Sequence, residues 1–130
     1  MTVVVPSKNE GSTLYFTLFH LDRQRGIEGT RVIVADSSTE SESEGWIRYS
    51  QRHLKNLRIE RIPGGYPAKA RLEGSKLVTT EFVLFLDADM WLWEDSVIER
   101  TMKEVSKADR DLVTTTVETC LLYTSDAADE

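Results

Sequence analysis

Residues 81–93 read EFVLFLDADMWLW, and this stretch decides the expected fold. Its apolar run from Phe82 to Leu86 is short and unbroken, which predicts a strand buried on both faces, as in parallel sheets. A helix is the competing interpretation, but the length of the run and the two threonines before it favour a strand. Asp87 and Asp89 follow at once, and carboxylates are costly to bury unless they are paired or bound to a metal. We therefore expect both acids to face a solvated crevice at the carboxyl end of the strand, where open α/β sheets bind ligands.

Strands and helices are expected to alternate along the rest of the chain. Further strands are predicted by β-branched and apolar runs at residues 2–6, 31–36, 57–62 and 112–117. Apolar residues at helical spacing predict four helices. They are expected over residues 12–26, over a segment that contains residues 46–54 and ends at about residue 54, over residues 67–77, and over residues 98–105. The order βαβαβαβαβ predicts the α/β class, with a mostly parallel sheet flanked by helices in a truncated Rossmann-like arrangement. Residues 57–62 alternate apolar and charged side chains, so this strand is expected nearer a sheet edge.

Length and composition narrow the possible functions. A chain of 130 residues fits one domain with a modest core. The formal net charge of −6 argues against a nucleic-acid partner, because phosphate backbones bind clusters of lysine and arginine. The sequence has no apolar run long enough to cross a membrane and no signal-peptide pattern at its start, so a cytoplasmic location is expected.

The end of the chain differs in character from the rest. Residues 120–130 read CLLYTSDAADE, which resembles the translation of a sequencing-library adapter. We therefore expect residues 1–119 to be a partial domain and residues 120–130 to be a non-native tail. A genuine polar tail is the alternative interpretation. Without these residues, which hold three acids and no base, the net charge of −6 becomes −3, and Cys120 says nothing about the redox compartment.

Polar side chains follow three of the predicted strands. Pro6 and Ser7 end the first strand, Asp36 ends the second, and Asp87 and Asp89 follow the strand at residues 82–86. In a parallel sheet these ends meet at one edge, so we expect the three carboxylates to lie along one exposed rim. The glycines at residues 64–65 precede a helix start, which offers backbone N–H groups to an anion. This set suits a nucleoside diphosphate with Mg²⁺ or Mn²⁺, because these ions commonly use one or two carboxylates plus substrate phosphates.

Three segments of the sequence resemble a known protein family and support this interpretation. They are TVVVPSKNE at residues 2–10, VIVADSSTE at residues 32–40, and GGYPAKARLEGSKLVTTEFVLFLDADM at residues 64–90. In order and spacing they resemble the N-terminal half of the inverting glycosyltransferases of family 2, which have the GT-A fold. The resemblance covers nearly all of residues 2–89 and is far more specific than a lone D-x-D motif.

The resemblance implies roles for particular residues. The nucleotide-sugar contacts that it implies are Pro6, Ser7, Glu10, Asp36, Arg71, Asp87 and Asp89. Of these, Asp36 would read the base, and Asp87 and Asp89 would hold the Mg²⁺ or Mn²⁺ ion, with a UDP-sugar favoured as donor. Lys8, Leu72 and Met90 depart from the family pattern, which leaves the fine donor specificity open.

The resemblance also implies a reaction. A sugar would pass from a nucleotide-sugar to an acceptor hydroxyl with inversion, in a single metal-assisted displacement. The family's catalytic base comes later in the chain, so no residue here is assigned that role, and the chain by itself is expected to be inactive. The resemblance implies a cytosolic location, and membrane association would come only from downstream segments.

Other interpretations of the same residues remain open. Asp87 and Asp89 are also typical of loop or helix-capping acids, and Asp36 is typical of an Asx turn through Ser38. A receiver-like regulatory module or another nucleotide-binding α/β module without catalysis is the alternative function. A receiver domain needs an acid pair after its first strand, where this chain has Ser7 and Lys8.

Overall fold

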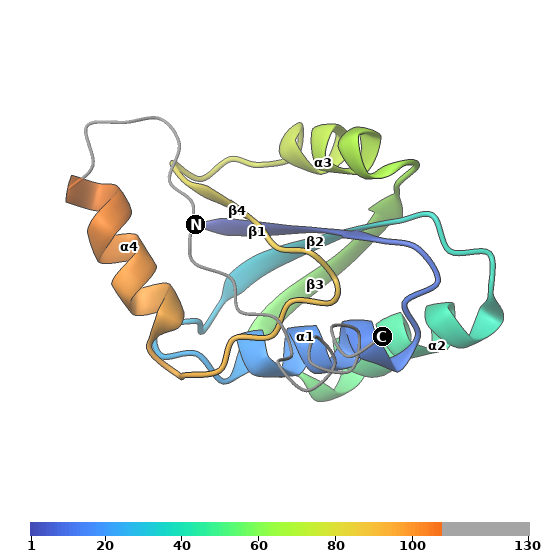
Figure 1. The fold of residues 1–130 in the computed structure, drawn as a ribbon, viewed down its shortest axis with the longest axis horizontal. Helices are drawn as coiled ribbons and strands as arrows, with labels where there is room; N and C mark the ends of the chain where they lie inside the picture. Colours follow the sequence, from blue (N-terminus) through green and yellow to red (C-terminus); the bar gives the residue numbers. More distant parts are fainter. Residues whose placement is uncertain (108–130) are drawn as a thin grey trace, which may run out of the picture. The chain divides into compact units, whose positions relative to one another are not determined.

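Strands and helices alternate along residues 1–107, the part of the chain that the computed structural model describes (Figure 1). The strands are β1 (Thr2–Ser7), β2 (Thr30–Asp36), β3 (Leu57–Pro63) and β4 (Val83–Phe85). The helices are α1 (Ser12–Asp22), α2 (Ser41–His53), α3 (Pro67–Ser75) and α4 (Val97–Lys107). The predicted α/β alternation is therefore confirmed as far as α4. The predicted strand at residues 112–117 and the tail at residues 120–130 lie outside the described residues.

The four strands form one parallel sheet in the order β3-β2-β1-β4. β1 pairs with β2 so that Ser7 lies beside Asp36, and β2 pairs with β3 so that Asp36 lies beside Pro63. All strands run in the same direction, so their carboxyl ends meet at one edge of the sheet. β3 is an outer strand of this sheet, which confirms the edge position predicted for residues 57–62.

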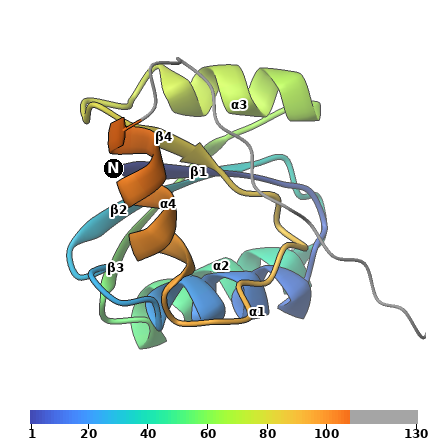
Figure 2. The same cartoon turned by 60° about the vertical axis from the view of Figure 1, so that its left-hand side comes forward.

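Helices cover both faces of the sheet, with α3 on one face and α1 and α2 on the other (Figures 1 and 2). The β-branched residues of β1 and β2 pack well on such a doubly covered sheet, and they form its core. The side chains in β1 and β2 with no exposed surface include Val3, Val4, Val5, Val32, Ile33 and Val34. The helices add the buried side chains Leu14, Leu18, Leu21 and Ile47.

Helix α3 approaches β1 closely because it carries a glycine at the contact. A Cβ atom at Gly74 would overlap Cγ1 of Val4 in β1. Packing in protein cores leaves no room for an extra methyl group without a shift of the neighbours. Gly74 therefore limits how near α3 can lie to β1.

The prediction that residues 82–86 form a strand buried on both faces is wrong. The observed strand is shorter, and its side chains at Val83 and Phe85 are 38% and 43% exposed. β4 is an outer strand among the described residues and pairs only with β1. An unbroken apolar run predicts a strand but cannot show how many neighbours will cover it.

Residues 1–99 form one compact unit, and α4 continues from it into a second unit that begins at Arg100. Every residue of the pocket described below belongs to the first unit. Within residues 1–107, no helix combines the length and the apolar character needed to cross a membrane.

The glycine at the α3–β1 contact gives the first testable prediction. Replacing Gly74 with Ala should lower the free energy of unfolding by about 1–3 kcal/mol, because the added methyl group overpacks the contact with Val4. Gly45 in α2 is the matched control, since a Cβ there meets nothing within 4 Å. Gly45→Ala should raise stability by up to about 1 kcal/mol through helix propensity alone. Urea denaturation measures both changes, and equal stabilisation by the two variants would contradict the packing argument.

Candidate functional site

A pocket of about 590 Å³ lies where the strand ends meet. Six of the seven residues predicted to bind the nucleotide-sugar line it, namely Pro6, Ser7, Glu10, Arg71, Asp87 and Asp89. They come from the end of β1, from the loop between β1 and α1, from α3, and from the loop after β4. The parallel register of the sheet therefore brings together residues that are up to 83 positions apart in the sequence.

The two acids after β4 have different surroundings. Nη2 of Arg71 donates to Oδ1 of Asp87 at 2.8 Å, so this carboxylate has a cationic partner. Asp89 has no hydrogen bond or ion pair to any of residues 1–107. Ala88 between them is 3% exposed, whereas both acids are exposed, so the chain alternates and points both carboxylates away from the core. An exposed carboxylate without a partner is available to bind a cation.

Glu10 adds a third acid to the same pocket. Partial burial raises the pKa of the Glu10 carboxyl above its ordinary value, and the negative charges of Asp89 and Asp87 raise this pKa further. Among residues 1–107, the basic residues that line the pocket are Lys8 and Arg71. Three acids and two bases therefore meet at this edge of the sheet, and the excess of carboxylates favours a bound cation.

These acids fit a metal ion that is shared with a ligand rather than one held by protein alone. Among residues 1–107 no group of three or more His, Cys, Asp or Glu residues has the geometry of a complete metal site. The donors at the pocket are carboxylate oxygens, which suit hard ions such as Mg²⁺ and Mn²⁺. Such ions are commonly held by one or two carboxylates with the remaining positions filled by water and phosphate oxygens.

The start of α3 forms another wall of the pocket. Gly65, Tyr66 and Pro67 all line it, and Gly65 has a φ of 135° that residues with a side chain rarely adopt. A Cβ atom at Gly64 would lie 2.8 Å from the carbonyl oxygen of Ala35, so this glycine lets the chain pass close to β2. The first backbone N–H groups of a helix and its dipole favour anions, which suits the phosphate groups of a ligand.

Ser7 ends β1 beside this wall and carries a buried hydroxyl group. Its side chain is 6% exposed, and its Oγ has no hydrogen-bond partner within residues 1–107. Buried polar groups are almost always hydrogen-bonded, so an unpaired one needs a reason. Because Ser7 lines the pocket, a bound ligand can supply the missing partner.

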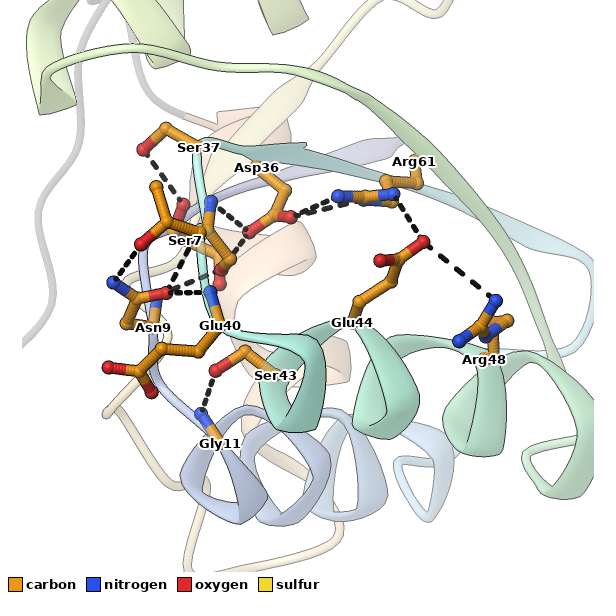
Figure 3. Close-up of polar contacts among 12 residues, drawn as sticks. Ser7, Asn9, Gly11, Asp36, Ser37, Glu40, Ser43, Glu44, Arg48 and Arg61 are labelled. Carbon is orange, nitrogen blue, oxygen red and sulfur yellow. Dashed lines mark hydrogen bonds and ion pairs between the residues drawn. The ribbon is translucent and has the colours of Figure 1, made fainter.

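Asp36 is the predicted site residue that does not line the pocket. Its side chain is fully buried, Nε of Arg61 donates to its Oδ2 at 3.0 Å, and Nη2 of Arg61 forms an ion pair with the same oxygen at 2.9 Å (Figure 3). The backbone N–H and the hydroxyl of Ser38 donate to Oδ1 at 3.2 and 2.5 Å, which confirms the Asx turn. The expectation that three carboxylates share one exposed rim is therefore wrong for Asp36, because Arg61 covers it. A contact between Asp36 and a nucleobase stays a prediction.

The ion pair under the pocket extends outward to α2 (Figure 3). Nη1 of Arg61 lies 3.3 Å from Oε1 of Glu44, and Nη1 of Arg48 lies 3.8 Å from the same oxygen. Removing one partner of a buried ion pair costs about 3–5 kcal/mol, because the other charge is left without compensation. Arg61 is therefore a structural requirement of the loop that begins at Asp36. The sequence analysis missed this residue, because nothing in the sequence pairs positions 36 and 61.

A second residue missed by the sequence analysis is Asn9, which joins the loops after β1 and β2. Its Oδ1 accepts hydrogen bonds from the backbone N–H groups of Thr39 and Glu40 at 2.9 and 3.1 Å (Figure 3). Its own backbone N–H donates to Oγ of Ser38 at 2.8 Å. Asn9 has a φ of 51°, a left-handed conformation that asparagine tolerates better than most residues. These contacts hold the two loops as one unit beside the pocket.

Solved structures with a similar fold support the observed architecture. Three of these similar structures are of S. aureus TarS, described as TarS, TarS 1-349 in complex with UDP-GlcNAc, and TarS 1-349 in complex with UDP. The sequence identities are 26%, 23% and 26%, with TM-scores of 0.63, 0.62 and 0.63. The aligned regions cover 81%, 82% and 81% of this chain and 19%, 31% and 32% of the TarS chains. The chain thus spans about a fifth to a third of these structures.

The sequence as a whole gives the family assignment. No curated protein matches the chain. The family described as Glycosyl transferase family 2 matches residues 2–124, which is nearly the whole chain. This match also favours an enzyme over the receiver-like alternative. The strand order, the acids beside the pocket and this match agree, and the chain belongs to glycosyl transferase family 2.

Proposed function

We propose that this chain is the donor-binding part of a glycosyltransferase that moves a sugar from a nucleoside-diphosphate sugar to an acceptor hydroxyl. The observation that carries the proposal is the pocket itself, which combines Asp87, Asp89, Arg71 and the start of α3. A diphosphate needs cations and N–H donors, and carboxylates beside it bind the divalent ion that it carries. Family membership supports the reaction class, and the chemistry of the pocket supports this edge of the sheet as the donor site.

The residues of the pocket have separate tasks in this proposal. Asp89 is the principal ligand for Mg²⁺ or Mn²⁺, because its carboxylate has no protein partner among residues 1–107. Asp87 shares the ion and is oriented by Arg71. When bound, the ion neutralises the charge that develops on the departing diphosphate. Arg71 and the α3 start bind the phosphates, and Ser7 donates or accepts a hydrogen bond with the nucleoside.

We further propose that the donor is a uridine-diphosphate hexose and that transfer inverts the anomeric carbon. The TarS structure in complex with UDP is 26% identical to this chain and supports uridine as the nucleoside. Inversion and the hexose follow from the family resemblance. The base that removes the acceptor proton is not assigned to any residue in the described part of the chain. The cytoplasmic location stays a prediction.

Binding of UDP with a divalent ion is the direct test. The melting temperature of the 130-residue chain should rise by several degrees when UDP and Mn²⁺ are added together, because a ligand at 100 times its Kd stabilises by about 2.7 kcal/mol. Asp89→Asn should abolish the rise, since it removes the unpaired carboxylate. Differential scanning fluorimetry and isothermal titration calorimetry measure the two effects.

A matched variant separates the site from general loss of charge. Asp95→Asn makes the same chemical change at an exposed acid that pairs with Arg25 and does not line the pocket. Exposed ion pairs contribute little to stability, so this variant should keep the full UDP–Mn²⁺ response. The site assignment fails if no nucleoside diphosphate changes the melting temperature of the unmodified chain, or if the two Asn variants respond alike.

The raised pKa of Glu10 gives a pH-dependent prediction for the metal-free chain. The folded chain holds the Glu10 proton more tightly than the unfolded chain, so this carboxyl lowers stability as pH rises through its folded pKa, starting near the ordinary value of 4.5. Glu10→Gln removes this loss and should be more stable than the unmodified chain near neutral pH, with no advantage at low pH. Urea denaturation in EDTA at several pH values measures the difference. A stability difference that does not change with pH would contradict this assignment.

A further inference from the structure

Thr17 is a polar residue in the core-facing stripe of α1. Its neighbours in that stripe, Leu14, Leu18 and Leu21, are buried, and Thr17 itself has no exposed surface. A threonine hydroxyl inside a helix commonly bonds to a carbonyl of its own helix. The Thr17 hydroxyl instead donates to the carbonyl oxygen of Ala88 at 2.6 Å, across 71 positions of sequence. A buried hydroxyl without a partner is costly, so this contact explains why a polar residue stands here.

The carbonyl of Ala88 belongs to the peptide unit that also contains the N–H of Asp89. The orientation of this peptide plane therefore affects the direction in which the Asp89 side chain leaves the backbone. Asp87 is oriented by Arg71, but the Asp89 carboxylate has no hydrogen bond or ion pair to any other residue of the range 1–107. Its position depends on the backbone alone.

Two backbone hydrogen bonds hold this loop on either side of Ala88. The N–H of Leu86 donates to the carbonyl of Val4 at 3.0 Å, and the N–H of Met90 donates to the carbonyl of Asp87 at 3.1 Å. The first fixes where the chain leaves β4 beside β1, and the second closes a turn. Neither bond involves the Ala88–Asp89 peptide, so the Thr17 hydroxyl is the contact that orients it.

We propose that Thr17 is a positioning residue for the metal-binding carboxylates. Its hydroxyl fixes the Ala88 carbonyl toward α1, which keeps Ala88 inward and both Asp87 and Asp89 directed into the pocket. The inference rests on the proposed function, because it assumes that these acids bind a divalent ion together with a nucleoside diphosphate. Partners that orient metal ligands typically change metal affinity by about 10- to 100-fold when they are removed, and Thr17 acts in this way through the backbone.

Two substitutions at Thr17 separate the hydroxyl from the shape of the side chain. Thr17→Val keeps the shape and removes the hydrogen-bond donor, whereas Thr17→Ser keeps the donor and removes a methyl group. Thr17→Val should weaken binding of Mn²⁺–UDP by about 10-fold or more, and Thr17→Ser should bind within about 3-fold of the unmodified chain. Calorimetric titration measures the affinities. Should the valine variant fail to fold, Thr17→Ala removes the same donor and is expected to show the same loss.

Thr2 is the matched control for a general loss of stability. It is equally buried, its Oγ1 lies 2.8 Å from Oγ1 of Thr80, and it stands at the opposite end of β1 from the pocket. Thr2→Val should lower the melting temperature yet leave the Mn²⁺–UDP affinity unchanged. A loss of affinity in Thr2→Val as large as in Thr17→Val would show that stability alone explains the effect and would overturn the inference.

A readout without ligand separates this inference from the proposed function. Amide chemical shifts and hydrogen exchange of residues 87–90 should change in metal-free Thr17→Val but not in Thr17→Ser or Thr2→Val. If the unmodified chain binds no Mn²⁺–UDP, the proposed function fails, and the amide readout still decides whether Thr17 orients the loop. Unchanged amides at residues 87–90 in Thr17→Val would overturn the positioning role in either case.

Discussion

Parallel pairing of β1 with both β2 and β4 is the constraint on which the rest of the structure depends. The β1–β2 register places Ser7 beside Asp36, and pairing with β4 brings the loop that carries Asp87 and Asp89 to the same edge. A slip of this pairing by one residue would turn each side chain of β1 to the other face of the sheet and would move Ser7 away from Asp36. The geometry of the pocket therefore depends on the pairing of the strands, and the loops supply the remaining lining residues.

The acidic residues near this edge of the sheet are arranged in two opposite ways. Asp36 is fully buried and neutralised by Arg61, which fixes the loop after β2 as part of the framework. Glu10, Asp87 and Asp89 line the pocket together with Arg71 and Lys8. The first arrangement stabilises the fold, because an unpaired buried acid would cost about 3–5 kcal/mol. The second places like charges close together, and the proposed metal ion would reduce their repulsion.

The sequence predicted the alternation of elements and most of the pocket, because both depend on local patterns. An apolar run that ends in acids, as at Leu86 and Asp87, indicates a strand end at a ligand site without reference to the rest of the chain. Contacts between distant residues could not be predicted in this way. Arg61 covers Asp36 because of the β2–β3 pairing, and the exposure of Phe85 depends on how many strands flank β4. No local sequence pattern at Arg61 or Phe85 predicts which residues will contact it.

Asp36 and Asp89 lie near the same edge of the sheet but have different surroundings. These surroundings favour a structural role for Asp36 and the proposed metal binding for Asp89. Both follow parallel strands, yet Asp36 has a cation from β3 within 3.0 Å and Asp89 has no hydrogen bond or ion pair within residues 1–107. Both carboxylate oxygens of buried Asp36 already accept hydrogen bonds, so a metal ion would have to displace one of its partners, whereas Asp87 is exposed and pairs with Arg71 through Oδ1. An unpaired, solvated carboxylate carries no such cost, provided that the backbone already points it at the site. The peptide before Asp89 is held by a buried hydrogen bond, so the proposed binding of a metal ion would require little reorganisation of this loop.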